Sequence, residues 1–158
     1  MEKKPIKRNE NIVQLSKDHH FTLLFCWKIR KGLKLEVEQD RIKKYVHYFW
    51  HQHMQPHFLA EETILFRPVK DEAVQRAFGD HAQIAQRITA LDAGGGHADE
   101  LSALADLVDN HVRYEERELF PHLEKVLTNE QLESIGKQIS TQCDPSLKDK
   151  FADEFWVP

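Results

Sequence analysis

Apolar residues recur every three or four positions along almost the whole chain, which is the spacing of the buried face of an α-helix. The sequence lacks runs that alternate apolar and polar residues between turn residues, as half-buried strands do. This pattern predicts an all-α protein. Because the connections between the long helical stretches are short, consecutive helices should be antiparallel neighbours, as in an up-down-up-down four-helix bundle.

The residues that start and stop helices divide the chain into a bundle and a short appendage. We expect a single domain over 1–158, with the bundle at about 10–127 and a short fifth helix and tail at 128–158. The fifth helix should open at Thr128-Asn129-Glu130-Gln131, which has the form of a capping box, and run to about 139. The four helices of the bundle are predicted at about 11–33, 37–66, 71–91 and 99–127.

Proline and glycine predict local features of these helices. Pro68 should end the second helix and Pro56 should bend it midway, while Gly94-Gly95-Gly96 should end the third as the most flexible connection. The tail carries Pro145 and three aromatic residues, which we expect to pack loosely on the bundle: Phe151, Phe155 and Trp156.

Charge and cysteine content argue against several classes of protein. The net charge of −4 comes from 22 basic and 26 acidic side chains mixed along the chain, so we expect no nucleic-acid partner and read Lys7-Arg8 as a solvated arm. Cys26 and Cys143 are too far apart in sequence to suggest a disulfide framework or a thiolate metal site. With no apolar run long enough to span a bilayer and no apolar stretch at the start, we expect no membrane association and a cytoplasmic location.

Histidine is unusually frequent, with ten in 158 residues, and two of the ten belong to a repeated motif. His57-x-x-x-Glu61 lies on the predicted second helix and His111-x-x-x-Glu115 on the fourth. Residues four apart share one helix face, so each helix can direct one nitrogen and one carboxylate toward the same point. Both motifs continue the apolar stripe of their helix and should therefore face inward. Buried carboxylates need a partner, and a metal ion is the simplest one here because Lys and Arg are scarce on these stripes.

Histidines of the other two helices fall on the same apolar faces. His81 lies on the apolar face of the third helix, and the first helix offers either His19, which is on its stripe, or His20 beside it. At 1.5 Å of rise per residue, these side chains should meet at one level of the bundle. Imidazole with bridging carboxylate suits iron, with manganese or zinc as substitutes, and two ions with open coordination positions could bind a small molecule such as dioxygen.

Taken together, these residues resemble the hemerythrin-like domains, or HHE cation-binding family. The resemblance spans about 13–127 and rests on Leu-x-x-Asp-His in the first helix, His57-x-x-x-Glu61-Glu62, the single His81, and His111-x-x-x-Glu115-Glu116 followed by Leu-Phe-Pro. It implies a non-haem di-iron centre. The family's ligands would fall on His19 or His20, His57, Glu61, His81, His111 and Glu115.

Two positions depart from the oxygen-carrying members of that family. They place a second histidine four residues after the one on the third helix, where this chain has Ala85, and they space the last carboxylate five rather than four residues after its histidine. His53, Glu118 or His122 could replace the missing ligand. Glu62 and Glu116 should form surface contacts or contact the ligands from outside.

The resemblance favours a protein that binds or senses dioxygen or nitric oxide over an enzyme. A di-iron redox enzyme, or a protein of iron handling or nitrosative-damage repair, is the alternative, with Tyr48 and Tyr114 as candidate redox-active side chains. A second alternative is an interaction module whose metal only stabilises the fold. The sequence does not predict an oligomeric state.

Overall fold

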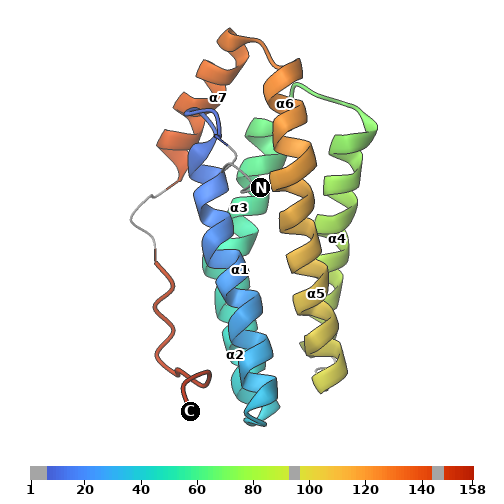
Figure 1. Ribbon diagram of the computed structural model, residues 1–158, viewed down its shortest axis with the longest axis vertical. Coiled ribbons are helices and arrows are strands. Elements are labelled where there is room, and N and C mark those ends of the chain that lie inside the picture. Colours follow the sequence, from blue (N-terminus) through green and yellow to red (C-terminus); the bar gives the residue numbers. More distant parts are fainter. Residues whose placement is uncertain (1–6, 93–96, 144–147) are drawn as a thin grey trace, which may run out of the picture.

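The computed structural model describes residues 7–92, 97–143 and 148–158, and in these ranges it contains helices and no strand. Four long helical runs pack side by side (Figure 1). This confirms the all-α bundle. The runs are α1 (Val13–Lys34), α2 to α3 (Gln39–Phe49 and Gln55–Ala60), α4 (Glu72–Asp92), and α5 to α6 (Ala98–Tyr114 and Phe120–Val126).

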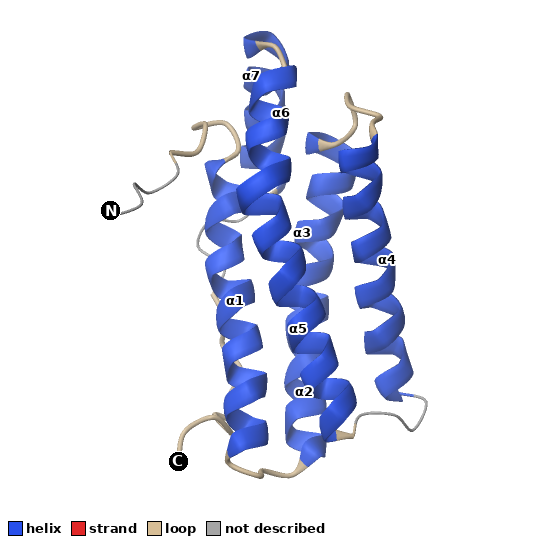
Figure 2. Ribbon diagram, turned by 45° about the vertical axis from the view of Figure 1, so that its right-hand side comes forward, coloured by secondary structure: helices blue, strands red, loops and turns tan. Residues whose placement is uncertain are grey.

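Successive runs point in opposite directions along the bundle (Figures 1 and 2). The fifth helix, α7 (Asn129–Gln142), packs beside the start of α1 at one end of the bundle (Figure 1). It opens with the predicted capping box, in which the Thr128 hydroxyl accepts from the Gln131 backbone N–H and the Gln131 side chain accepts in return. No helix in the described ranges has the length and apolar character needed to cross a bilayer.

Three π-helical turns interrupt the second and fourth runs, at Trp50–Met54, Glu61–Leu65 and Glu115–Leu119. In each, a backbone N–H bonds to the carbonyl five residues back, which widens the turn and is common at functional sites. Pro56 and Pro121 each lie at the start of the α-helical segment that follows such a turn, where a missing N–H is best tolerated. Two of the three turns begin at the glutamates of the repeated motifs.

The core is divided into two apolar clusters. One packs residues such as Phe25, Phe49 and Leu104, and the other packs residues such as Leu15, Leu65 and Phe120. Along α1, His19 lies between Leu15 of one cluster and Phe25 of the other, so a layer of buried polar side chains separates the two apolar clusters.

The C-terminal segment is tightly packed, which corrects the prediction of a loose tail. Phe155 is 1 % exposed and lies against Gly32 of α1, where a Cβ atom would come within 2.7 Å of the Phe155 ring. Asp149 accepts hydrogen bonds from the Tyr45 hydroxyl and the Lys28 ammonium. The absence of a side chain at Gly32 leaves room for this ring. The features predicted at 94–96 and Pro145 lie outside the described residues.

Of the two basic residues expected to be solvated, Lys7 is exposed but Arg8 is packed. The Arg8 side chain is 5 % exposed and donates to the Glu116 carbonyl and the Glu124 carboxylate. Its guanidinium lies 5.5 Å from the centre of the Phe120 ring. Arg8 therefore joins the start of the described chain to the fourth helical run.

Candidate metal centre

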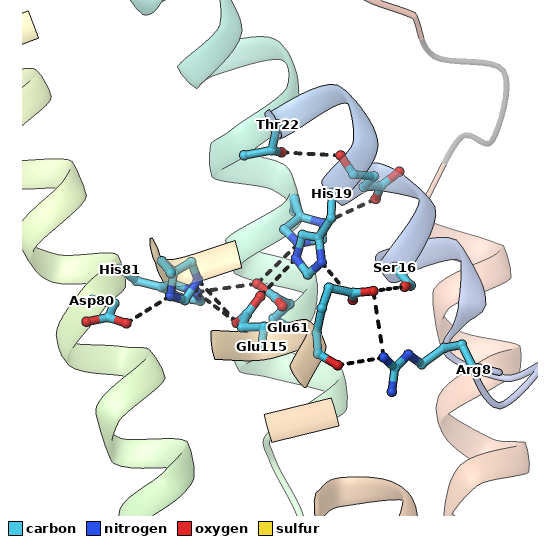
Figure 3. Close-up of polar contacts among 12 residues, drawn as sticks. Arg8, Ser16, His19, Thr22, Glu61, Asp80, His81 and Glu115 are labelled. Carbon is cyan, nitrogen blue, oxygen red and sulfur yellow. Dashed lines mark hydrogen bonds and ion pairs between the residues drawn. The ribbon is translucent and has the colours of Figure 1, made fainter. Parts of the chain in front are cut away.

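Six ionisable side chains from all four helical runs converge in the polar layer between the two apolar clusters (Figure 3). None is more than 6 % exposed. They form two overlapping groups whose potential ligand atoms all lie within 4.8 Å of one another. The groups are His19, His57, Glu61 and Glu115, and Glu61, His81, His111 and Glu115.

The histidines form two pairs with their Nε2 atoms directed at each other. In the first histidine pair, Nε2 of His19 and Nε2 of His57 are 3.2 Å apart; in the second histidine pair, Nε2 of His81 and Nε2 of His111 are 3.1 Å apart. Two nitrogens bound at right angles to one ion at about 2.1 Å would lie about 3.0 Å apart. Each pair thus has the spacing of two ligands on a single metal ion.

The two central glutamates, Glu61 and Glu115, lie between these pairs (Figure 3). Oε1 of Glu61 is 3.3 Å from Nε2 of His57 and 3.3 Å from Nε2 of His81. Glu115 reaches His19 with one oxygen, at 2.9 Å, and His111 with the other, at 3.2 Å. Each glutamate therefore contacts both pairs, as a carboxylate that bridges two ions would.

The carboxylate oxygens of this layer are short of hydrogen-bond donors. Both oxygens of Glu61 and Oε2 of Glu115 are buried without a hydrogen-bond partner. Burying an ionised carboxylate without a partner destabilises the folded state by roughly several kcal/mol, even after the protein relaxes around it. Such oxygens are therefore normally paired or bound to metal. This donor set fits one or two divalent cations.

Each histidine is held from outside by a second carboxylate. Nδ1 of His19 lies 2.9 Å from Glu116, and Nδ1 of His81 lies 2.8 Å from Glu62. An ionised carboxylate can only accept, so Nδ1 must carry a proton, and Nε2 is the nitrogen that a metal ion at the centre would bind in place of its proton. The hydroxyl of Ser16 also donates to Glu116 and fixes its position.

The other two histidines use aspartates in the same way. Nδ1 of His57 lies 3.1 Å from Asp18, and Nδ1 of His111 lies 3.0 Å from Asp80. Sequence analysis did not assign this role to either aspartate, although there was a signal. Each immediately precedes a histidine of the cluster, as Asp18-His19 and Asp80-His81.

These contacts repeat with a two-fold pattern between the halves of the chain. The first half supplies Asp18-His19 and His57-x-x-x-Glu61-Glu62, and the second half supplies Asp80-His81 and His111-x-x-x-Glu115-Glu116. In each half, the aspartate contacts the histidine of the His-x-x-x-Glu motif in the same half. The second glutamate, which follows that motif, contacts the histidine of the Asp-His pair in the other half. The two potential metal positions are therefore built from equivalent parts.

The protein's own charges act strongly on these imidazoles. Burial alone lowers the pKa of His57, but the negative charge of the nearby Glu61 and the hydrogen bond to Asp18 outweigh it and raise the pKa to about 10. The same balance, with other carboxylates, raises the pKa of His81 to about 11 and that of His111 to about 9. The anionic environment that attracts a proton to these nitrogens would equally attract a metal cation.

The other side chains that the sequence offered as metal ligands lie outside the cluster. His20 is exposed and lies outside the cluster, since it is one position, or about 100°, further around α1 than His19. Glu118 is exposed, and His122 pairs with Asp71 at 2.7 Å. His53 is half-buried against Phe49 and is not among the six clustered residues. None of these side chains replaces the histidine missing at residue 85.

A helical bundle with buried histidine pairs joined by two carboxylates defines the chain as a protein built to hold cations in its core. The family model for the hemerythrin HHE cation-binding domain matches residues 11–123. The chain therefore belongs to the hemerythrin HHE cation-binding domain family. No curated protein and no solved structure matches the chain.

Proposed function

We propose that the protein holds two non-haem iron ions, one at each histidine pair, and that this centre binds a diatomic molecule, dioxygen or nitric oxide. The ligands would be the six clustered side chains, with Glu61 and Glu115 bridging the ions. The observation that most supports this is the set of buried carboxylate oxygens without hydrogen-bond partners between two histidine pairs.

The donor set favours iron among the available metals. Two imidazoles with carboxylate oxygens and open positions are typical of non-haem iron sites, whereas structural zinc sites are closed and often use thiolate. With two histidines and two shared glutamates per ion, the protein supplies four ligands, so two positions of an octahedral ion stay open. Bound iron would supply a redox-active cation with room for a small ligand.

The chain's own residues would prepare this centre before metal arrives. The outer carboxylates orient the four imidazoles and hold their protons on Nδ1. The two apolar clusters on either side lower the dielectric constant around the layer, which strengthens the attraction between the carboxylates and a cation.

Metal analysis combined with absorption spectroscopy tests this proposal. We expect about two irons per chain, and a spectrum of the reduced protein that changes on exposure to dioxygen or nitric oxide and returns when the gas is removed. A spectrum that changes irreversibly would instead support the redox-enzyme alternative. Absence of any spectral change with iron fully bound would support a metal that only stabilises the fold.

The variant Glu115→Gln tests the bridging role. Glutamine keeps the shape of the side chain but removes the charge that both histidine pairs share, so we expect the iron content to fall to one ion per chain or fewer. Glu118→Gln is the matched control, because Glu118 is exposed on the same helical run and should leave the content at two. Two irons in the Glu115→Gln protein would contradict the assignment.

A further inference from the structure

Arg8 and Ser16 lie on the outer side of His19, away from the central glutamates (Figure 3). The Arg8 guanidinium donates a hydrogen bond to the backbone carbonyl of Glu116, at 2.8 Å, and lies 3.7 Å from the carboxylate of the same residue. That carboxylate lies 2.9 Å from Nδ1 of His19. The guanidinium also faces the ring of Phe120, at 5.5 Å, and this ring stacks on the His19 imidazole with centroids 5.4 Å apart. Arg8 therefore contacts two side chains that hold His19 in place.

The start of the described chain is folded so that Arg8 is held in this position. The backbone N–H of Asn11 donates to the Asn9 side chain, at 2.9 Å, and that of Ile12 donates to the Asn9 carbonyl, at 3.1 Å, which closes a turn before α1. Ile12 is fully buried and anchors this turn in an apolar cluster. The Glu124 carboxylate accepts a second hydrogen bond from the guanidinium, at 2.7 Å. The Arg8 side chain is therefore fixed both by the turn and by its partners on the fourth helical run.

The counterpart of Glu116 has no such support among the described residues. Glu62 has His81 as its one hydrogen-bond or ion-pair partner in that part of the chain, and its side chain is 30 % exposed. Glu116 instead has the Ser16 hydroxyl and the Arg8 guanidinium as additional partners. Arg8 thus distinguishes two potential metal positions that are otherwise built from equivalent parts.

We propose that Arg8 is a positioning residue for the metal position at His19 and His57, and that it acts through Glu116. The inference deepens the proposed function and rests on it for the presence of a metal ion at this position. Arg8 precedes the span 11–123 that matches the family model, so this support comes from outside the matched domain. The affinity of one metal position then depends on how the start of the chain docks on the bundle.

Arg8 has two opposing effects on a cation, and their sizes can be compared. Its positive charge would repel a metal ion, but the Glu124 carboxylate lies 2.7 Å from the guanidinium and offsets that charge. Loss of a carboxylate that contacts the outer nitrogen of a ligand histidine, in contrast, weakens metal binding by about 10- to 100-fold. Removal of Arg8, which holds such a carboxylate, should therefore weaken metal binding rather than strengthen it.

Zinc titration, followed by the imidazole nitrogen resonances of the four clustered histidines, tests this proposal. It gives each histidine pair its own binding curve and requires neither iron nor a diatomic ligand. In Arg8→Gln, the curve of the first histidine pair should move to about tenfold higher free zinc, the lower end of the range for direct carboxylate partners, while that of the second pair stays in place. Lys7→Gln is the matched control, because it removes one charge from an exposed neighbouring side chain and should leave both curves unchanged.

Two further variants separate positioning from a general effect on stability. Arg8→Lys keeps the charge, but one ammonium cannot replace a planar guanidinium on the Glu116 carbonyl, Glu124 and the Phe120 ring together. Its curve for the first histidine pair should therefore lie closer to that of Arg8→Gln than to that of the unmodified protein. In a Glu116→Gln background, Arg8→Gln should cause no further loss of affinity, because its effect passes through the carboxylate that is already gone.

Three results would overturn the role of Arg8: tighter zinc binding in Arg8→Gln, an equal shift of both curves, or an undiminished loss in the Glu116→Gln background. These results would leave the proposed function intact, because zinc would still bind at both histidine pairs of the unmodified protein. Absence of zinc binding at either pair of the unmodified protein would instead reject the metal centre, and the role of Arg8 with it.

Discussion

The imidazole of each clustered histidine is fixed by a carboxylate on its outer nitrogen, so the cluster depends on ten side chains rather than six. Outer carboxylates keep the ring in one tautomer and raise its basicity as a ligand. Asp18 and Asp80 do this for His57 and His111. Substitution of either aspartate should therefore weaken metal binding, although neither side chain reaches the centre.

The variant Asp80→Asn should weaken metal binding by about 10- to 100-fold with little change in the fold, because the amide can still contact Nδ1 but no longer stabilises its proton by charge. Competition with a chelator of known affinity measures the change. Asp106→Asn is the control: Asp106 pairs with Arg30 at the surface, so its loss should leave metal affinity unchanged. Identical affinities for Asp80→Asn and the unmodified protein would refute the role of the aspartate.

The raised pKa values of these histidines give the metal-free protein a particular pH dependence. The folded-state pKa values of about 10 for His57, 11 for His81 and 9 for His111 exceed the ordinary 6.5 of an unfolded chain. Their stabilisation is therefore complete below pH 6.5 and is lost as pH rises through 9 to 11. Burial acts to raise the pKa of Glu115, but the charge of His111 and its hydrogen bond outweigh it, so the pKa is lowered. Glu115 therefore stabilises the fold above about pH 4.5 and loses this contribution as the pH falls further.

Urea unfolding of the metal-free protein should accordingly show the midpoint falling from pH 6.5 to pH 10. Metal binding should have the reverse pH dependence, since it displaces histidine protons and becomes tighter as pH rises. Calorimetry in buffers of different ionisation enthalpy would count the protons released. A metal-free midpoint that rises with pH over this range would show that the histidines are not charged in the folded state.

At the scale of elements, the helix pattern was predictable but its irregularities were not. The apolar period and the breakers placed all five helices within a few residues of their observed ends. The π turns at Glu61 and Glu115 were not predicted, because an apolar period of about 3.6 residues does not resolve a single wider turn. The tail was also misjudged, since its aromatic residues show no periodicity that would indicate a docking position.

The fit of the tail on α1 predicts opposite effects for two glycine substitutions. Gly32→Ala should lower the free energy of unfolding by about 1 to 3 kcal/mol, because its Cβ would meet the rigid Phe155 ring at 2.7 Å. Gly79→Ala should instead raise it by about 0.5 to 1 kcal/mol, since Gly79 is an exposed helical position with nothing within 4 Å of the added atom. Denaturant unfolding of the metal-free variants compares them directly.

At the scale of the whole molecule, the polar layer proposed to hold metal is also the part of the core that contains buried carboxylate oxygens without hydrogen-bond partners. It places two buried glutamates between the apolar clusters, and in the absence of metal their charges are balanced only by protonated histidines. A bound cation would relieve this imbalance and link all four helical runs at one level. Metal binding and stability should therefore be coupled.

Removal of metal should lower the melting temperature without abolishing the helical fold, since both apolar clusters are built from side chains that are not metal ligands. At free metal 1,000-fold above the dissociation constant, the linked stabilisation is roughly 4 kcal/mol. Circular dichroism melts of the loaded and chelated protein measure this shift. Complete loss of helix on chelation would mean that the metal is required for folding, and an unchanged melting temperature would mean that it is not bound in the core.

The sequence by itself determined the all-α class, the helix bounds, the family resemblance and the motifs that place His57 with Glu61 and His111 with Glu115. These depend on helical periodicity, which is a local property. The tertiary structure decided which neighbours the helices present to one another: that His19 rather than His20 faces the centre, that Asp18 and Asp80 hold imidazoles, and that Arg8 and the tail pack against the bundle. Such pairings depend on how each helix is rotated against its neighbours, and the apolar pattern determines that rotation only to within about one residue.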